Sequence, residues 1–337
     1  MIATQLNEAE IQVLATLRRI ELEEQCADRA SLEAEGERYW IFLEDWRDAY
    51  ASLMAKGLID GNDKAYRLTE AGRPQGDAYY RERPDLYWYY YQRFYSAAYS
   101  SAAHSRLCER VYGEDLCQEG QMDMAALGDL LACIDLKAGD KLLDLGCGAG
   151  VISKYISDRS GATVTGIDYC ASAIAAAMAR TEDLRSRLTF LQGDLNSLDL
   201  PSKAYDAAIM IDSIYWVADT VEALAAITRS IKPGGQLAVV IVQTLEEGDG
   251  PELLEPDNTA VARALAELNL SYEVHDQSEQ FKDFWPRIKE SVVALREEFE
   301  AEGNGFICDS LEREADDDYL PAIRADAIRR YLYHVRL

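Results

Sequence analysis

The sequence is short of positive charge. Its 337 residues include 34 lysines and arginines against 60 aspartates and glutamates, which gives a formal net charge of −26. A chain with this average field repels polyphosphates, so nucleic acid is not expected as a partner. The same excess of acid keeps a protein soluble, and only part of it needs to serve the attraction of a cationic substrate.

Long apolar runs are missing as well. No run approaches the ~20 residues that a membrane-spanning helix needs. The N-terminal sequence MIATQLNEAEIQ has neither the basic start nor the apolar core of a signal peptide. The seven cysteines form no C-x-x-C pair, and their odd number favours free thiols in a reducing compartment over a disulfide framework. We therefore expect a cytoplasmic protein that has no membrane contact and no metal site.

The stretch LLDLGCGAG, residues 142–150, is the most informative part of the chain. Apolar residues around the carboxylate of Asp144 are typical of a buried parallel strand, and the three glycines that follow predict a sharp turn into a helix. Glycine lacks a Cβ, so the backbone of this turn can approach a ligand closely. The G-x-G-x-G spacing, without a following Lys-Ser/Thr pair, disfavours a dinucleotide site and a Walker phosphate loop.

Further buried strands are predicted to end in an acid: residues 162–170 with Asp168, 188–192 with Asp194, and 207–211 with Asp212. KPGGQLAVVIVQ predicts a fifth strand, and IRRYLYHVRL a last, antiparallel one. Because the carboxyl ends of parallel strands meet at one edge of an open sheet, we expect these acids to border a ligand site. Asp168 takes the place of the carboxylate that binds ribose hydroxyls in a Rossmann-like unit, although it could simply cap the next helix.

The first 82 residues predict helices and one hairpin. Apolar residues recur at helical spacing in residues 7–28 and 40–57, and residues 57–73 hold two short apolar stretches around an Asp-Gly-Asn-Asp turn. This arrangement resembles a winged-helix domain. Its candidate recognition helix carries Glu44, Asp45 and Asp48 beside a single Arg47. We therefore expect it to support dimerisation or to close a pocket, and not to bind DNA.

Tyrosines crowd the segment between residues 83 and 120. They are Tyr87, Tyr89, Tyr90, Tyr91, Tyr95, Tyr99 and Tyr112. In one interpretation, the segment is a connecting helix whose rings pack between domains. In the other, some of the rings and His104 line a substrate pocket, because a phenol offers an apolar body and a polar tip. The two interpretations are compatible.

In this order and at these intervals, LLDLGCGAG, TGIDYC, LQGDLNSLDL, YDAAIMIDSIYWV and IKPGGQLAVV resemble the landmarks of class I S-adenosylmethionine-dependent methyltransferases. The resemblance covers residues 120–243 well and the terminal RYLYHV less specifically. It implies a seven-stranded Rossmann-like sheet with S-adenosylmethionine at the strand ends. The residues that it places around this cofactor are Asp144, Gly146, Cys147, Gly148 and Gly150 at the methionine part, Asp168 with its neighbour Tyr169 at the ribose, Asp194 and Leu195 beside the adenine, and Ile211 and Asp212 beside the sulfonium.

One departure from the family concerns the catalytic base. Plant-type O-methyltransferases, which also carry a winged-helix N-terminal domain, have a histidine soon after the fourth strand, whereas this chain has Tyr215 and Trp216 there. An unprotonated amine needs no base, because the sulfonium is already activated and positioning supplies much of the acceleration. A hydroxyl acceptor would need one, for which His104 and Tyr95 are the candidates, with Tyr215 also placed at the reaction centre. The residues expected to contact the substrate are Tyr99, Tyr112 and Trp216.

The expected architecture is α/β in three parts. They are a winged-helix-like domain at 1–82, a tyrosine-rich connecting or lid segment at 83–120, and a methyltransferase domain at 121–337 with a helical cap at about 246–328. The expected activity is methyl transfer from S-adenosylmethionine to an amine, hydroxyl or carbon nucleophile of a small molecule. A protein or RNA methyltransferase and a cofactor-sensing winged-helix regulator stay open as alternatives. The N-terminal domain is the expected site of any homodimer.

Overall fold

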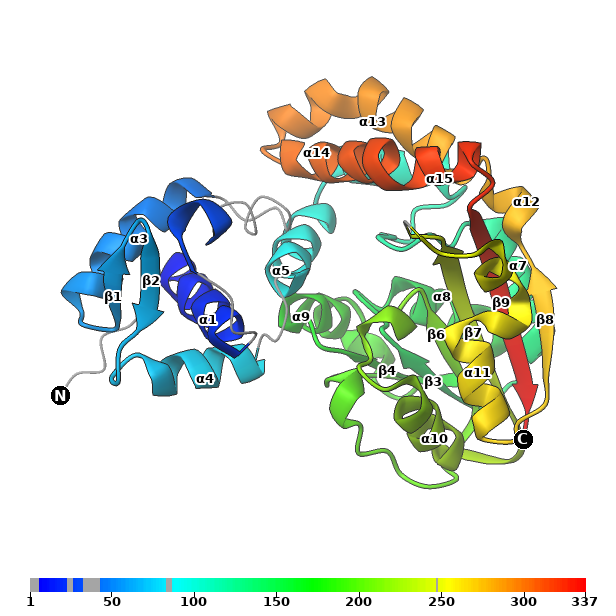
Figure 1. Ribbon diagram of the computed structural model, residues 1–337. Coiled ribbons are helices and arrows are strands. Elements are labelled where there is room, and N and C mark those ends of the chain that lie inside the picture. Colours follow the sequence, from blue (N-terminus) through cyan, green and yellow to red (C-terminus); the bar gives the residue numbers. More distant parts are fainter. Residues whose placement is uncertain (1–5, 23–26, 33–42, 83–86, 247) are drawn as a thin grey trace. The chain divides into compact units, whose positions relative to one another are not determined.

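A computed structural model describes residues 6–22, 27–32, 43–82, 87–246 and 248–337 (Figure 1). The chain forms two compact units, Met1–Phe94 and Tyr95–Leu337, with the boundary inside α5 (Tyr87–Ala98). The side chains of Glu44, Asp45, Tyr87 and Tyr89, and all of Trp40, lie outside the described residues. Within these ranges, no helix is long and apolar enough to cross a membrane.

The first unit combines helices with one hairpin. Its elements are α1 (Glu8–Leu22), α3 (Leu43–Ala55), β1 (Ile59–Asn62), β2 (Ala65–Leu68) and α4 (Arg73–Glu82). The predicted hairpin is present, because β1 and β2 pair antiparallel with Ile59 opposite Leu68. At the start of α1, the Asn7 and Glu10 side chains each accept a hydrogen bond from the other residue's backbone N–H, at 2.8 and 2.9 Å. This reciprocal capping satisfies two N–H groups and explains where the helix begins.

Aromatic residues fill the core of the first unit. Trp46 of α3 is fully buried, and its indole N–H donates to Gln12 of α1 over 2.8 Å. Tyr50 of α3 stacks on Tyr66 of β2 with ring centroids 4.8 Å apart. The aromatic spacing in this part of the sequence therefore reflects packing between α1, α3 and the hairpin.

The second unit is built on a seven-stranded sheet. Its strands are β3 (Lys141–Leu145), β4 (Thr163–Asp168), β5 (Leu188–Gln192), β6 (Tyr205–Ile211), β7 (Ile231–Thr244), β8 (Tyr272–Asp276) and β9 (Ile328–Arg336). They lie in the order β5-β4-β3-β6-β7-β9-β8. Strands β3 to β7 are parallel, and β9 runs antiparallel to both neighbours. The predicted fold class and the antiparallel last strand are confirmed.

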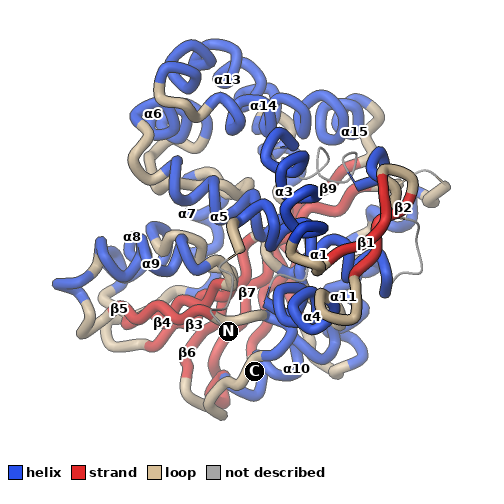
Figure 2. Tube along the Cα trace, turned by 90° about the vertical axis from the view of Figure 1, so that its left-hand side faces the viewer, coloured by secondary structure: helices blue, strands red, loops and turns tan. Residues whose placement is uncertain are grey.

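Helices cover both faces of this sheet (Figure 2). One face packs against α7 (Met124–Ile134), α8 (Val151–Ser160) and α9 (Ala171–Arg180), and the other against α10 (Thr220–Ser230) and α11 (Ala260–Glu267). Successive residues of β3 serve opposite faces: Leu142 joins the first core, and Leu143 and Leu145 join the second. Burial on both faces explains the almost continuous apolar run before the glycines.

The expectation of a wholly helical region at 246–328 is corrected. Strand β8 lies within it at the sheet edge, and α11 packs on the sheet. The sequence YEVHD of β8 is short, polar and largely exposed, as is common for edge strands, and so gives a weak signal.

Short 3-10 turns connect several of these elements. They are η1 (Glu182–Leu184), η2 (Leu195–Ser197), η3 (Ile214–Trp216), η4 (Pro251–Leu254) and η5 (Pro256–Asn258).

A helical layer stands over the carboxyl ends of the parallel strands (Figure 1). It comprises α6 (Ala102–Val111), α12 (Ser278–Phe281), α13 (Phe284–Ala301), α14 (Gly305–Arg313), the π-helical turn η6 (Glu314–Tyr319) and α15 (Leu320–Arg324). Helix α13 packs against α6 and α14. Glu302, just after α13, accepts from the backbone N–H of Ala103 (3.0 Å) and from the hydroxyl of Ser101, the N-cap residue of α6. This carboxylate stabilises the start of α6.

Candidate active site

The turn between β3 and α8 requires glycine. Gly146 and Gly148 have φ values of 79° and 52°, in the left-handed region that side chains disfavour. A Cβ on Gly146 would lie 2.4 Å from the Cβ of Ser213, and a Cβ on Gly148 would lie 2.4 Å from the hydroxyl oxygen of Tyr95. The turn therefore presents bare backbone to Tyr95 and to the residues after β6.

A pocket opens beside this turn. The space between its walls is about 530 Å³, which includes the solvent in its open mouth. Its wall combines residues from five places in the chain: Tyr95, residues 116–120 with Met122, Asp144, residues 146–149 with Val151 and Ile152, and Ile211. Strands β3 and β6 are neighbours here, whereas the chain runs outward from them in opposite directions, which makes this the switch point of the sheet. The structure thus brings Asp144, the glycine turn, Ile211 and Tyr95 together, as the sequence predicts.

Two buried carboxylates organise the glycine turn. Asp168, at the end of β4, is 8% exposed and accepts from the backbone N–H groups of Gly148 (2.8 Å) and Cys170 (2.9 Å). Asp144 is 3% exposed and accepts from the hydroxyl of Ser153 in α8. Burial raises the pKa of both carboxyls, to about 6 for Asp144. Asp168 therefore ties the turn to the start of α9, and it lies behind the pocket wall and not in it.

Three further predicted cofactor residues follow β4 and β5: Tyr169 is expected at the ribose, and Asp194 and Leu195 beside the adenine. Asp194 accepts from the backbone N–H of Asn196 (2.9 Å) and caps η2. Leu195 packs half-buried against the sheet core, and the carbonyl of Tyr169 accepts from the Gln192 amide over 3.1 Å. Among the described residues, these three predicted ones are not part of the pocket wall.

Asp212 forms a buried ion pair with Arg330 of β9. Both guanidinium nitrogens donate to its two carboxylate oxygens over 3.0 Å, and the two side chains are 5% and 1% exposed. One of these oxygens also accepts from the backbone N–H of Gln121 over 2.9 Å. Burial lowers and Asp212 raises the pKa of Arg330, with a net rise. The carboxylate is therefore engaged by protein partners in this conformation.

The segment around Gly120 and Gln121 is fixed by side chains of the helical layer. The amide of Gln121 donates to the Tyr319 hydroxyl over 2.9 Å, and its carbonyl accepts from the Trp285 indole N–H over 3.0 Å. The rings of Trp285 and Tyr319 stack with centroids 4.0 Å apart. The Tyr112 hydroxyl donates to the carbonyl of Gly120 over 2.9 Å. The predicted lid segment is thus attached to α6, α13 and η6.

Two carboxyls of this region titrate unusually. Glu119 belongs to the pocket wall; its burial and the charges of Glu314, Asp212 and Asp168 raise its pKa well above the usual range. Glu314 begins η6, and burial raises its pKa to about 7 despite a hydrogen bond from Ser310. A carboxylate whose pKa is raised is a stronger base than an ordinary one, so it can take a proton from a ligand when it is ionised.

The tyrosines at the site retain their protons. Burial and the charge of Asp168 raise the pKa of Tyr95. Tyr215 of η3 is 47% exposed; its hydroxyl accepts from the backbone N–H of Val242, and burial raises its pKa. Both phenols are therefore better suited to donate hydrogen bonds than to act as bases.

Other predicted residues also lie outside the pocket wall: Tyr99, His104, Tyr112, Gly150, Asp168, Asp212, Tyr215 and Trp216. His104 of α6 is 1% exposed; its ring nitrogens lie 3.7 and 3.8 Å from Cys108 Sγ, and burial lowers its pKa to about 4. Tyr99 is 48% exposed and lies under the Arg180 guanidinium, 4.8 Å from the ring centroid. The carbonyl of Trp216 accepts from the Asn196 amide over 2.9 Å.

Sequence reasoning missed several residues at the site: Glu119, Gln121, Trp285, Glu314, Tyr319 and Arg330. One signal was available for Arg330, because two adjacent arginines, Arg329 and Arg330, interrupt the alternation of apolar and polar residues in this strand. Glu119 and Gln121 flank Gly120, in a stretch that already resembled a lid. No comparable signal pointed to Glu314 or Tyr319, because they lie in a π-helical turn between two helices.

Comparison with known proteins supports the interpretation of the sheet and its turn. Residues 143–239 match a family model described as a methyltransferase domain. The chain is 28% identical over 150 residues to phosphoethanolamine N-methyltransferase 3 of Arabidopsis thaliana, which covers 44% of this chain and 30% of that protein. It is 30% identical over 181 residues to a sterol 24-C-methyltransferase of Gibberella zeae. That alignment covers 53% of this chain and 46% of the relative. The chain thus spans less than half the length of these two relatives.

A solved structure shares the fold. It is phosphoethanolamine N-methyltransferase 2 of Haemonchus contortus, in complex with phosphomonomethylethanolamine and S-adenosylhomocysteine. The TM-score is 0.53 at 18% identity, and the alignment covers 73% of this chain and 60% of that one. Together with the sheet order, this likeness shows that the second unit has the Rossmann-like methyltransferase fold, and residues 143–239 within it match the methyltransferase domain model.

Proposed function

We propose that the Tyr95–Leu337 unit transfers a methyl group from S-adenosylmethionine to a small-molecule acceptor. The observation that carries the proposal is the glycine turn, held between Asp144 and Asp168 at the switch point of the sheet. The matched family model and the methyltransferase relatives support the same reaction class.

The residues present fit this cofactor. A Cβ would fill the space over Gly148, so bare backbone is available to the methionine part, together with Asp144 and Cys147. Asp168, with Tyr169 beside it, would bind the ribose hydroxyls. Asp194 and Leu195 would border the adenine. Ile211 and Asp212 would lie near the sulfonium. The cofactor supplies an activated methyl group, and the contribution of the chain is to orient the acceptor and to exclude water.

The acceptor in this proposal is a small amine. Glu119 lies in the pocket wall and has a raised pKa, so its carboxylate can take the proton that an ammonium must lose before it becomes a nucleophile. The Tyr95 hydroxyl, which lies over the glycine turn, can orient the acceptor by hydrogen bonding. The excess negative charge of the chain favours a cationic acceptor over a polyanionic one.

Titration calorimetry with S-adenosylhomocysteine tests the cofactor site. Asp168→Asn removes the charge from two hydrogen bonds to the ribose, each of which contributes about 1.5 to 3 kcal/mol when charged, so affinity should fall at least tenfold. Asp199→Asn, an exposed acid beyond β5, is the matched control and should bind as the wild type does. Unchanged affinity in Asp168→Asn would refute the ribose assignment, and no binding by the wild type would refute the proposal.

Mass spectrometry of the products tests the acceptor. The wild type is incubated with S-adenosylmethionine and with small amines, phenols or carboxylates, and we expect methylated amines to dominate. Glu119→Gln should lower turnover most at pH values above the pKa of Glu119, where the wild-type carboxylate is ionised and can accept a proton, and below the pKa of the acceptor, where its ammonium form prevails. A preference for a polyanionic acceptor would contradict the amine assignment.

We propose that the Met1–Phe94 unit is a winged-helix-like domain that supports dimerisation and does not bind DNA. We also propose that the protein works in a reducing cellular compartment. The acidic sequence of α3 supports this assignment, since phosphate contacts need Lys and Arg. Sedimentation should show a dimer, and a gel-shift assay at low salt should show no sequence-specific retention of DNA. Specific retention would favour a regulator instead.

A further inference from the structure

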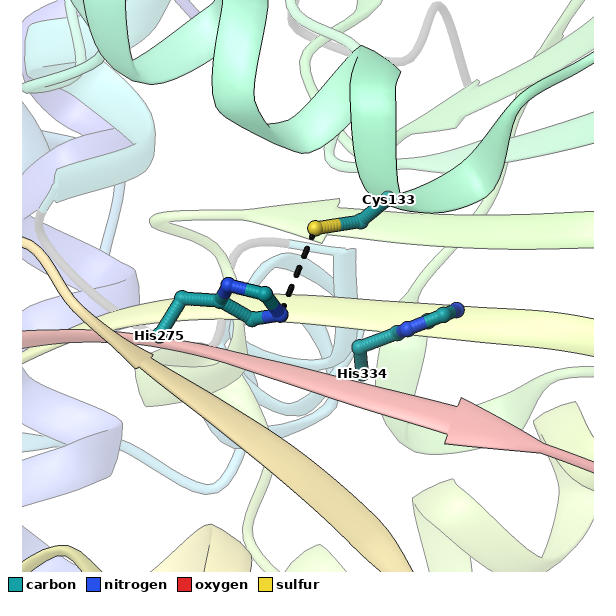
Figure 3. Close-up of side chains that lie close together, drawn as sticks. All are labelled: Cys133, His275 and His334. Carbon is teal, nitrogen blue, oxygen red and sulfur yellow. Dashed lines mark hydrogen bonds between the residues drawn. The ribbon is translucent and has the colours of Figure 1, made fainter.

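Two of the three histidines in the chain meet a cysteine away from the pocket (Figure 3). Cys133 lies in the last turn of α7, His275 in β8 and His334 in β9. One ligand atom of each residue lies within 4.8 Å of the other two, and Cys133 Sγ is 3.4 Å from His275 Nε2. His334 is four residues from Arg330 on β9, which corresponds to about 13 Å of extended strand. The cluster is therefore separate from the proposed methyl-transfer site.

The register of the sheet places a further carboxylate at this cluster. Glu273 of β8 is directly opposite His334 of β9, and its Oε2 lies 3.9 Å from His334 Nδ1. His275 is two residues further along β8, so it projects from the same face of the strand as Glu273. Helix α7, which carries Cys133, packs on this face. Four potential ligands thus come together from three elements.

The orientation of His334 is set by neighbouring groups. The Gln236 amide nitrogen donates to the carbonyl of Ile134 over 2.8 Å, so its oxygen faces His334 Nε2, 2.9 Å away. Nε2 must then carry the proton and donate, which leaves the lone pair on Nδ1. Figure 3 shows that Nδ1 is the ring nitrogen nearer to the other two residues. A histidine held through its other nitrogen by an oxygen acceptor is the usual arrangement of a metal ligand.

The distances are close to those of a tetrahedral zinc site. A thiolate at ~2.3 Å and an imidazole at ~2.0 Å from one zinc ion are about 3.5 Å apart, and Cys133 Sγ and His275 Nε2 are separated by 3.4 Å. The third atom lies within 4.8 Å, and a small rotation of the side chains would close the difference. Sulfur and imidazole donors together select zinc and similar ions over magnesium or calcium.

We propose that Cys133, His275 and His334 bind a divalent transition-metal ion of the zinc class, with Glu273 or water as the fourth ligand. Binding converts the Cys133 thiol to a thiolate and releases its proton to solvent. The ion connects α7 to the edge strand β8 and to β9, so it stabilises the outer edge of the sheet. The ligand spacing in the sequence did not predict such a site, because Cys133 and His275 are 142 residues apart.

Metal titration of the full chain tests the proposal. The purified protein is stripped with a chelator and titrated with Zn²⁺ by calorimetry and with Co²⁺ by absorbance, where a thiolate ligand produces a charge-transfer band. We expect one equivalent to bind with that band. Cys133→Ser should abolish the band, and Gln236→Leu, which releases His334, should weaken binding by about 10- to 100-fold. Cys108→Ser, beside the buried His104, is the matched control and should leave binding unchanged.

His275→Gln should disturb folding least among the ligand variants, because His275 lies on the exposed edge strand. This variant keeps the test valid if Cys133→Ser folds poorly. Zn²⁺ should raise the melting temperature of the wild type and not that of His275→Gln, and both should bind S-adenosylhomocysteine equally. Absence of stoichiometric binding by the wild type would overturn the proposal. So would a charge-transfer band that persists in Cys133→Ser or disappears in Cys108→Ser; the Cys133–His275 contact would then be an ordinary hydrogen bond.

Discussion

The two walls of the pocket are built in different ways. On the glycine side, Asp144, Gly148 and Asp168 belong to two successive strand–helix units, and their contacts are mainly to backbone N–H groups and to the start of a helix. On the opposite side, the lining residues between 116 and 122 are supported from behind by contacts between distant parts of the chain, which we call the distant wall. Gln121 meets Tyr319 across 198 residues of sequence, and Arg330 meets Asp212 across 118. The first wall is local in the chain, and the second is assembled from distant elements.

This difference separates the two tasks of the site. The geometry of the local wall follows from the strand, the turn and the helix, so it persists as long as the sheet folds. The distant wall depends on side chains that match one another, and a buried charge without its partner is costly. We infer that the acceptor specificity can change through the distant wall while the cofactor side stays constant.

Removal of Arg330 from its ion pair with Asp212 should destabilise the distant wall. Arg330→Leu leaves the buried Asp212 carboxylate uncompensated, and we expect a loss of about 3 to 5 kcal/mol in the free energy of unfolding. Arg329→Leu removes the adjacent, more exposed arginine, which pairs with Asp326, and should cost about 1 kcal/mol or less. Urea unfolding measures both.

The double variant Asp212→Asn with Arg330→Leu sharpens this test. It removes both charges, so it should recover part of the stability that Arg330→Leu loses. Equal stability of Arg330→Leu and Arg329→Leu would show that the ion pair does not hold this wall.

A side chain in the glycine turn should damage the local wall. Gly146→Ala places a methyl group against Ser213 in a left-handed backbone; the conformation costs about 1 to 2 kcal/mol and the overlap about 1 to 3 kcal/mol. Gly234→Ala isolates the first cost, because Gly234 has a similar φ of 81° but nothing within 4 Å of an added Cβ. Thermal unfolding should rank Gly146→Ala well below Gly234→Ala, and calorimetry should show weaker S-adenosylhomocysteine binding only for Gly146→Ala. Matching losses in both variants would contradict the steric argument.

The pH dependence of stability should depend on the distant wall through Glu314. Its pKa is raised by burial from 4.5 to about 7, so its contribution to stability is complete below about pH 4.5 and is lost as the pH rises through about 7. Relative to Glu314→Gln, the wild type should therefore lose at most about 3 kcal/mol between pH 5 and pH 8. Urea unfolding at four pH values in this range measures the difference.

Glu312 provides the matched control for this pH effect. The pKa of Glu312 is lowered by hydrogen bonding to Lys289, with burial opposing it. Its contribution is therefore present above its usual pKa, and Glu312→Gln should follow the wild type between pH 5 and pH 8. A curve for Glu314→Gln that also runs parallel to that of the wild type would show that Glu314 is not held in its neutral form.

The local wall was predictable from sequence and the distant wall was not. Strand β5 has the predicted bounds, and Asp144 and the glycine turn lie where alternation and spacing placed them. Asp212 was found by its position after a strand, but its partner Arg330 depends on how β9 pairs with β7, which no local pattern specifies. His104 was a candidate because of its chemistry, and the structure buries it in a helix contact with Cys108. The periodicity of apolar residues predicts which face of a helix or strand is buried. It does not predict which distant side chain will contact that face.

The position of β9 in the sheet has a consequence for synthesis on the ribosome. Strands β7 and β8 emerge first, but they cannot pair with each other, because β9 lies between them and is made last. Until then, the nascent chain exposes two unpaired strand edges, which are prone to association with other chains. The same late strand delivers Arg330 to Asp212 and His334 to Cys133. Completion of the sheet, of the distant pocket wall and of the proposed ion site is therefore a single event at the end of translation of this domain.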